Sequence, residues 1–219
     1  MIGAPPPKPR PPIARRKKRR RAKPPARGES TRVQILQSAA AAFRKLGYHG
    51  ATVQRIAAAL RMEKGNLYYY FRNKEEILFA CHQYSLDRLI RLLDEISASD
   101  ESPDAKLRTL IVALVHTILD ELHGTTLFID LVALTPAHLK TIIGRRDRVD
   151  RGMRQIIADG AASGTFGDRD AKLLSLAILG AVNWIPRWFK PDGPASSDEI
   201  ADCFASYLIA GLRPRHGPG

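Results

Sequence analysis

The chain has 219 residues, and its 44% hydrophobic content is enough for a sizeable core in one or two domains. Its two cysteines, Cys81 and Cys203, are too few and too far apart for a disulfide framework or a zinc pattern, which fits a reducing, cytoplasmic location. No apolar run approaches the roughly 20 residues that a membrane-spanning helix needs, so we do not expect a membrane protein.

The net charge of +13 is concentrated at the N-terminus. Residues 1–28 carry 11 of the 35 Lys and Arg residues and no acid, whereas the rest of the chain holds 24 basic residues against 22 acids. The same segment holds eight prolines and few large aliphatic residues, so we expect it, like residues 213–219, to be disordered. A basic arm of this kind can follow phosphates or enter a minor groove. The alternatives are a solvated tail and a wrongly assigned start codon.

A first helix is predicted over residues 31–46, because apolar residues recur there at helical spacing. Gly47 is the residue expected to end it in a left-handed conformation. The apolar positions are Val33, Leu36, Ala39, Ala40 and Phe43.

A helix-turn-helix pattern follows over residues 52–71. Thr52 can cap a short helix whose apolar stripe is Val53, Ile56, Ala57 and Leu60, and Arg61-Met62-Glu63 breaks that helix. A second short helix runs over residues 64–71, with Leu67, Tyr70 and Phe71 facing the first. Asn73 followed by Glu76 is a capping-box signature, and it predicts a long helix over residues 74–98 that connects the head to the rest of the protein.

The second short helix directs polar and aromatic side chains outward, namely Lys64, Asn66, Tyr68 and Tyr69. An α-helix fits the major groove of DNA, and amide, basic and phenolic groups at its start can reach base edges and phosphates. The pattern therefore favours a DNA-binding helix-turn-helix, with an ordinary helical hairpin as the alternative.

The identities of the residues in this segment are more specific than its helical geometry. Thr52-Val53, Ile56-Ala57, Leu67 to Phe71 and Lys74 to Leu78 resemble the signature of TetR-type bacterial transcriptional regulators. The resemblance implies an all-α, homodimeric DNA-binding protein that recognises a palindromic operator and responds to a small molecule. The family commonly has glycine where this chain has Arg61, at a position that can require a positive φ.

Roles for individual residues follow from their chemistry and from the resemblance. Thr52 and Tyr68 can bind phosphates, and Lys74 can pair with another. Lys64, Asn66 and Tyr69 are best placed for bases, since Asn pairs with adenine and Lys with guanine. Arg55 can serve either purpose, and Gly65 completes the DNA-binding set.

The remaining chain predicts further helices and no strand, so the expected fold is all-α. The helices are expected over residues 104–122, 125–134, 137–162, 168–189 and 197–212. Inward positions in the third of these include Leu139, Ile142, Ile143, Val149, Met153, Ile156 and Ile157, and Pro186 is expected to kink the end of the fourth. We assign residues 29–89 to a DNA-binding domain and residues 90–212 to a larger ligand-binding and dimerisation domain. The last two helices, with their aliphatic residues, are expected to form a four-helix bundle with those of a second copy, which is the usual TetR arrangement.

A candidate effector site lies near the C-terminus, where Trp184 and Trp188 sit four residues apart beside Arg187. An aromatic pair with a cation suits a ligand with apolar and anionic parts, although core packing is the alternative. The segment resembles a TetR subgroup whose members include repressors of sterol and fatty-acid breakdown that respond to coenzyme A thioesters. His116 and Phe128, in the part of the chain expected to line the pocket, complete the candidate ligand contacts.

His116, Asp120 and His123 share one helical face, but a fourth ligand is not evident, so we expect no metal site. No cofactor motif appears, and no nucleophile elbow, phosphate loop or paired-acid pattern indicates an enzyme. The favoured interpretation is that the protein is a repressor released by a hydrophobic or acyl-CoA-type effector. A drug-sensing repressor of efflux genes and a basic-tailed, non-specific DNA-binding protein are the alternatives.

Overall fold

The computed structural model describes residues 26–119, 131–190 and 192–214, with side chains from residue 29 onward. These residues form eight α-helices and no strand, which confirms the all-α prediction. The helices are α1 (Ala26–Gly50), α2 (Val53–Ala59), α3 (Lys64–Tyr70), α4 (Lys74–Ala98), α5 (Pro103–Leu119), α6 (Pro136–Ala162), α7 (Ala171–Trp184) and α8 (Ser197–Ala210). Two 3₁₀ segments, η2 (Leu131–Ala133) and η3 (Ile185–Arg187), precede α6 and follow α7.

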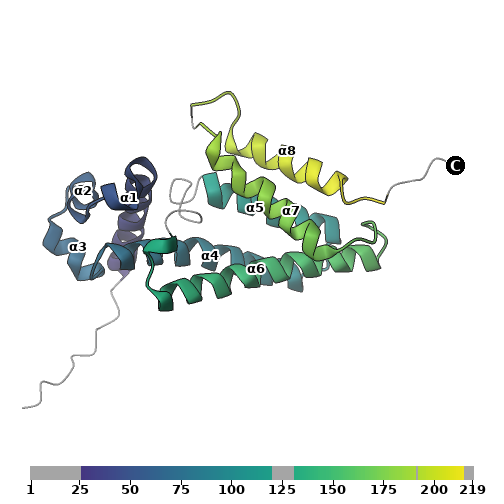
Figure 1. Ribbon diagram of the computed structural model, residues 1–219, viewed down its shortest axis with the longest axis horizontal. Helices are drawn as coiled ribbons and strands as arrows, with labels where there is room; N and C mark the ends of the chain where they lie inside the picture. The colour runs from purple at the N-terminus through teal and green to yellow at the C-terminus, as the bar shows by residue number, and fades with distance from the viewer. Residues whose placement is uncertain (1–25, 120–130, 191, 215–219) are drawn as a thin grey trace, which may run out of the picture.

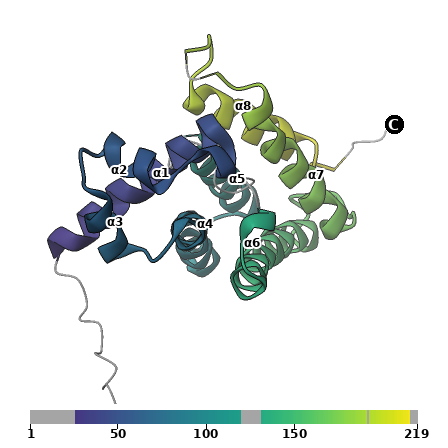
Figure 2. The same ribbon diagram turned by 60° about the vertical axis from the view of Figure 1, so that its left-hand side comes forward.

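The helices fall into a small head and a larger body (Figure 1). The head is the cluster of α1, α2 and α3 at one end of the molecule, and α4 leads from it into the body, where it runs beside α6. In the body α5 packs against α4, α6 and α8, while α7 packs against α6 (Figure 2). Helix α4 is continuous through residue 89, so the boundary that we assign between the two domains falls inside one helix.

Helix α4 is held to both parts because its apolar stripe is buried over its whole length. Ile77, Leu78 and Cys81 face the head, and Leu89 and Leu93 lie in the body core. Acidic side chains on α4 also pair with basic ones on α6. Asp94 accepts from Arg148 at 2.7 Å, Asp87 pairs with Arg145, and Glu75 accepts from His138 Nδ1 at 2.7 Å.

The N-terminal boundary of the first helix differs from the prediction. Helix α1 begins at Ala26 instead of Thr31, so residues 26–28 belong to a helix and not to the tail; residues 1–25 lie outside the described part. Gly47 has φ 68° and ψ 169°, a positive φ as expected, but one further helical turn follows it before Ala51, whose N–H donates to the Gly47 carbonyl at 3.1 Å.

The body requires three further corrections. The α-helix expected to reach residue 189 ends at Trp184, since Pro186 has no N–H for another i→i−4 bond and the chain tightens into η3. Ile143 was expected inside but is exposed, because Ile142 already occupies the core face and the next residue lies about 100° around the helix. Of the helix expected over 125–134, residues 131–133 form only a 3₁₀ turn, and 125–130 lie outside the described residues.

Candidate nucleic-acid interface and ligand cavities

The head forms a rigid scaffold behind the helix-turn-helix. Ile56, Leu67 and Phe71 are fully buried, and the Ser38 hydroxyl donates to the Ile56 carbonyl at 3.2 Å, which fixes α2 against α1. As predicted, the Thr52 hydroxyl caps α2 by accepting from the Arg55 N–H at 3.2 Å. These contacts leave α2 and α3 few ways to move relative to each other.

The turn between the two helices has the conformation that the resemblance implied. Arg61 has φ 51°, and it is the one non-glycine residue with a positive φ in the described part of the chain. Its N–H donates to Ala58 at 3.0 Å, and the Met62 N–H donates to Ala57 at 2.9 Å, so the turn closes the end of α2. The chain therefore adopts the tight turn despite having arginine where glycine is common.

Helix α3 presents a polar and aromatic face to solvent. Lys64, Gly65, Asn66 and Tyr68 are all exposed on it, and Tyr69 is 72% exposed. Leu67, which lies between them in the sequence, points inward, so the side chains of the outer face do not take part in the core. Amide, ammonium and phenolic groups on one exposed helix can donate to and accept from base edges in a major groove.

Lys74 and Arg55 are placed differently from this face. The Lys74 ammonium donates to the Tyr48 carbonyl at 2.5 Å and lies 4.1 Å from the Tyr48 ring centroid, so it ties the start of α4 to the end of α1. Arg55, which is exposed, donates to the Gly50 carbonyl at 3.1 Å. Both are near the edge of the head, and their predicted contacts with phosphates stay predictions.

Asn73 caps α4 as predicted, by accepting from the Glu76 N–H at 2.8 Å. The reciprocal half of the capping box is displaced by one residue, because the Glu76 carboxylate accepts from the Arg72 N–H at 2.6 Å. The start of α4 is thus anchored immediately after α3.

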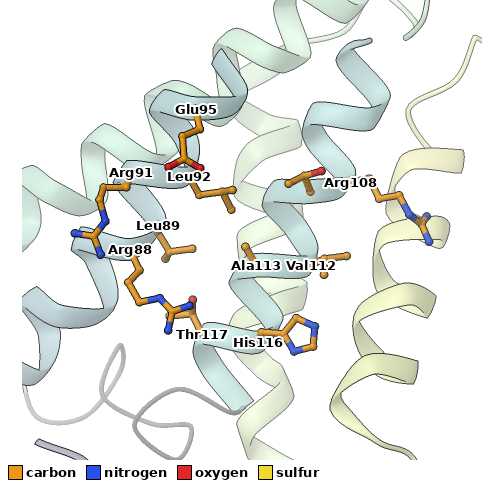
Figure 3. A pocket seen from close by; sticks show the side chains of 11 residues that line it. Arg88, Leu89, Arg91, Leu92, Glu95, Arg108, Val112, Ala113, His116 and Thr117 are labelled. Atoms are coloured by element: carbon orange, nitrogen blue, oxygen red, sulfur yellow. The ribbon is translucent and has the colours of Figure 1, made fainter. Parts of the chain in front are cut away.

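The body contains an open groove of about 700 Å³ between α4 and α5. In Figure 3 Leu89 and Leu92 of α4 are directed toward α5, whereas Arg91 points away from α5. Arg108 and His116 point to the other side of α5, toward α8. Its charged lining is predominantly basic, and consists of Arg88, Arg91 and Arg108 with one acid, Glu95; His116 also lines it. Arg108 is engaged by α8, since it donates to Asp202 and to Ser206 at 3.0 Å.

A smaller cavity of about 100 Å³ lies among α4, α5, α6 and α7. Its walls are mostly aliphatic, but Arg146, Asp150 and Asn183 also line it. Burial lowers the pKa of the Arg146 guanidinium. Leu89 lines both this cavity and the groove, so the two spaces adjoin at its side chain.

Trp184, Arg187 and Trp188, the tryptophan segment, line neither space. Trp184 is 64% exposed with the Arg187 guanidinium 5.8 Å from its ring centroid, and Trp188 stacks on Phe204 of α8 at 6.1 Å. The structure therefore does not bring Trp184, Arg187 and Trp188 together with His116, which lines the groove. Their contact with an effector stays a prediction, and Phe128 lies outside the described residues.

His116 lies 3.4 Å from Asp198, its neighbour on α8. Asp120 and His123, the other members of the considered metal constellation, fall outside the described residues. Among the residues that the structure describes, no cluster of three or more His, Cys, Asp or Glu side chains could hold a metal ion. Within the same residues no helix is both long and apolar enough to cross a membrane.

One face of α7 is apolar and exposed. Leu173, Leu176 and Trp184 follow each other at helical spacing, and Leu173 is 64% exposed. On α8, Tyr207 is 79% exposed. Large apolar side chains gathered in this way commonly mark an interface with another protein surface.

A helix-turn-helix head on an all-α body defines the chain as a helix-turn-helix transcriptional regulator, and comparison with known proteins supports this class. The family model described as "Bacterial regulatory proteins, tetR family" matches residues 35–81, and "Tetracyclin repressor-like, C-terminal domain" matches residues 100–212. The chain belongs to the TetR family, whose members are DNA-binding regulators and not enzymes.

Individual relatives span nearly the whole protein. The HTH-type transcriptional repressor KstR2 of Mycolicibacterium smegmatis is 27% identical over 88% of this chain and 96% of its own length. The TetR family regulator PfmR of Thermus thermophilus is 31% identical, with a TM-score of 0.74 over 82% of this chain and 99% of that one. AibR, in a complex with isovaleryl coenzyme A and operator DNA, is 29% identical, with a TM-score of 0.68 over 81% and 98%.

The sequence did not indicate that arginines line the α4–α5 groove and the small cavity. The apolar stripe of α4 leaves Arg88 and Arg91 on its outer face, and this local pattern does not reveal the groove that α5 completes. Arg146 lies in a run of charged residues, 145–148, which hides it in the sequence. Its spacing carried a signal, because it lies four residues after Ile142 and three before Val149, within the stripe that faces the core.

Proposed function

We propose that this protein is a homodimeric repressor that binds a palindromic operator through α3 and is released by a small-molecule effector, an acyl-coenzyme A thioester. The observation that carries DNA reading is the exposed face of α3, where Lys64, Asn66 and Tyr69 stand on a fully buried scaffold. Because each protomer offers one such helix, a symmetric dimer reads two half-sites one or more helical turns apart.

The exposed apolar face of α7, together with Tyr207 of α8, supports the dimer. Leu173 and Leu176 would be costly to leave in water, and a second copy offers the same surface in return, as a two-fold interface requires. This arrangement assigns Trp184 a place at or near the interface as well, since it continues the same stripe.

Three features support the effector class. The groove is lined by three arginines against one acid, which suits a ligand rich in phosphate. Beneath it lies a mostly aliphatic cavity. A related regulator, AibR, has been solved with isovaleryl coenzyme A and operator DNA. A drug-sensing repressor of hydrophobic cations is less well supported, because acids facing the groove would favour it and Glu95 is the single one in the lining.

DNA reading is tested by fluorescence anisotropy with a palindromic operator fragment from beside the protein's own gene and with a scrambled duplex. Asn66→Ala should weaken operator binding by about 5- to 150-fold, the range expected for one bidentate base contact, and leave binding to the scrambled duplex almost unchanged. Gln37→Ala is the matched control, since Gln37 is an exposed amide on α1 of the same head. Equal losses on both duplexes would argue against base reading by α3.

Deleting residues 1–25 separates the regulator from the remaining alternative, a basic-tailed non-specific binder. The regulator should bind its operator more weakly and with a smaller salt dependence but keep its selectivity. A truncated protein that no longer distinguishes the two duplexes would favour the tail as the binding element.

A further inference from the structure

The groove between α4 and α5 and the small cavity beside it differ chemically, and they share one lining residue, Leu89. On the solvent side Arg88 and Arg91 extend from adjacent turns of α4, and Arg108 of α5 also lines the groove but points toward α8 (Figure 3). On the inner side lies the cavity of about 100 Å³ among α4, α5, α6 and α7. Leu89, on the same turn of α4 as Arg88, has its side chain in the wall of both and is only 2% exposed.

The basic compartment has the size and charge for a large anionic group. Its volume of about 700 Å³ falls within the range of pockets that bind small molecules. Arg108 is already paired with Asp202, whereas Arg91, on the opposite wall, is exposed to solvent. Guanidinium groups bind phosphate through two parallel hydrogen bonds, so the Arg88–Arg91 side of the groove suits phosphates.

The inner compartment is small and selects by size. An apolar cavity of about 150 Å³ accommodates benzene, so one of about 100 Å³ admits an acyl group of about four or five carbons before its walls must move. Arg146 adds N–H donors to a wall that is otherwise mostly aliphatic, and these donors suit a carbonyl oxygen.

We infer that Arg88 and Arg91 bind the phosphates of a coenzyme A thioester in the α4–α5 groove, and that Leu89 is the gate through which a short acyl group reaches the cavity at Arg146. This inference rests on the proposed effector class and deepens it. It places effector recognition on α4, the helix that begins directly after the DNA-reading helix, so that ligand contacts and operator contacts share one element. It also separates recognition from Trp184, Arg187 and Trp188, which line neither compartment.

The test is isothermal titration of the full-length protein with free coenzyme A, isovaleryl-CoA, hexanoyl-CoA and decanoyl-CoA, with operator release measured in parallel. The wild-type protein should prefer isovaleryl-CoA. The double variant Arg88→Gln, Arg91→Gln should bind every thioester, and free coenzyme A, at least tenfold more weakly, since it loses charge-assisted contacts to phosphate. Arg151→Gln is the matched control, because Arg151 is an exposed arginine on α6 that lines neither compartment.

The gate is tested by the selectivity between acyl chains, which a general loss of stability would not change. Leu89→Ala should shift the ratio of affinities toward hexanoyl-CoA and decanoyl-CoA, by about fourfold for each additional methylene group that becomes buried. Leu89→Val, which keeps more of the packing, should shift the ratio in the same direction and by less. The affinity of each variant for free coenzyme A, measured alongside, is the baseline from which the contribution of the acyl chain is calculated.

The possible outcomes tell an error in the proposed site apart from an error in the proposed effector class. If thioesters bind and release the operator but the double arginine variant matches Arg151→Gln, the site is wrong and the effector class stands. If instead Arg187→Gln alone weakens binding, the ligand lies at the tryptophan segment. If the wild-type protein binds no thioester at all, the proposed effector class and the inference fall together.

Discussion

Replacing Glu75 by glutamine tests how α6 is joined to the start of α4. The Glu75 carboxylate accepts from the Thr135 N–H at 2.9 Å, at the N-cap of α6, and from His138 Nδ1 at 2.7 Å. The His138 ring also stacks on Phe79 with 3.7 Å between centroids. Because the Glu75 side chain is only 15% exposed, solvent screens these contacts weakly.

The expected loss of stability follows from these contacts. Hydrogen bonds to a charged group contribute about 1.5–3 kcal/mol each and neutral ones about 0.5–1.5 kcal/mol. Both donors reach the same oxygen, Oε1, so a glutamine carbonyl in its place keeps both bonds in the weaker, neutral form. We therefore expect Glu75→Gln to lower the free energy of unfolding by about 1–2 kcal/mol. With a urea dependence of about 2 kcal/mol per molar, the unfolding midpoint should fall by about 0.5–1 M.

The assay is urea unfolding, followed by circular dichroism at one fixed protein concentration because the protein is expected to dimerise. Glu101→Gln is the control for the loss of a charge, since Glu101 is exposed in the turn between α4 and α5, and its midpoint should barely change. A double-mutant cycle with His138→Ala separates the Glu75–His138 contact from the stacking on Phe79. The reasoning is refuted if Glu75→Gln unfolds at the midpoint of Glu101→Gln, or if its effect adds fully to that of His138→Ala.

Two further predictions concern buried positions in the body and head. A Cβ at Gly160 would overlap the buried Phe166 ring, whereas one at Gly144 in the same helix would meet nothing within 4 Å. In the same urea assay Gly160→Ala should therefore destabilise the protein by about 1–3 kcal/mol, whereas Gly144→Ala should stabilise it by about 0.5–1 kcal/mol. Equal effects of the two substitutions would show that the Phe166 ring moves aside freely. Burial raises the pKa of the Cys81 thiol, so little reactive thiolate exists near neutral pH. A Cys203→Ser variant removes the exposed thiol and leaves Cys81. In this variant Ellman's reagent should modify no thiol in the native protein and one thiol in urea. Rapid modification of the native protein would contradict the burial of Cys81.

The helices and their caps could be predicted from the sequence because they depend on neighbours a few residues away. Periodic apolar residues, Thr52 before α2 and Asn73 before α4 are local signals, and the structure has both caps in the expected places. Among the apolar residues Ile143 is an exception, because it is exposed. The outward face of α3 is local in the same sense, since a helix of known phase presents its polar side wherever it packs. The positive φ of Arg61 was implied by the resemblance to the family, which commonly has glycine at this position.

The ligand spaces were decided by tertiary structure alone. Arg88 and Arg91 belong to a groove only because α5 lies opposite them, and Arg108 comes from that second helix. Glu75 and His138 are 63 residues apart, so no local pattern indicates their contact. Leu89 looked like one more core leucine, yet the packing of four helices places it between a basic groove and an apolar cavity. A single sequence records the period of each helix, but the angle and depth at which helices pack are set by side chains distant in the chain, and these determine which residues share a cavity.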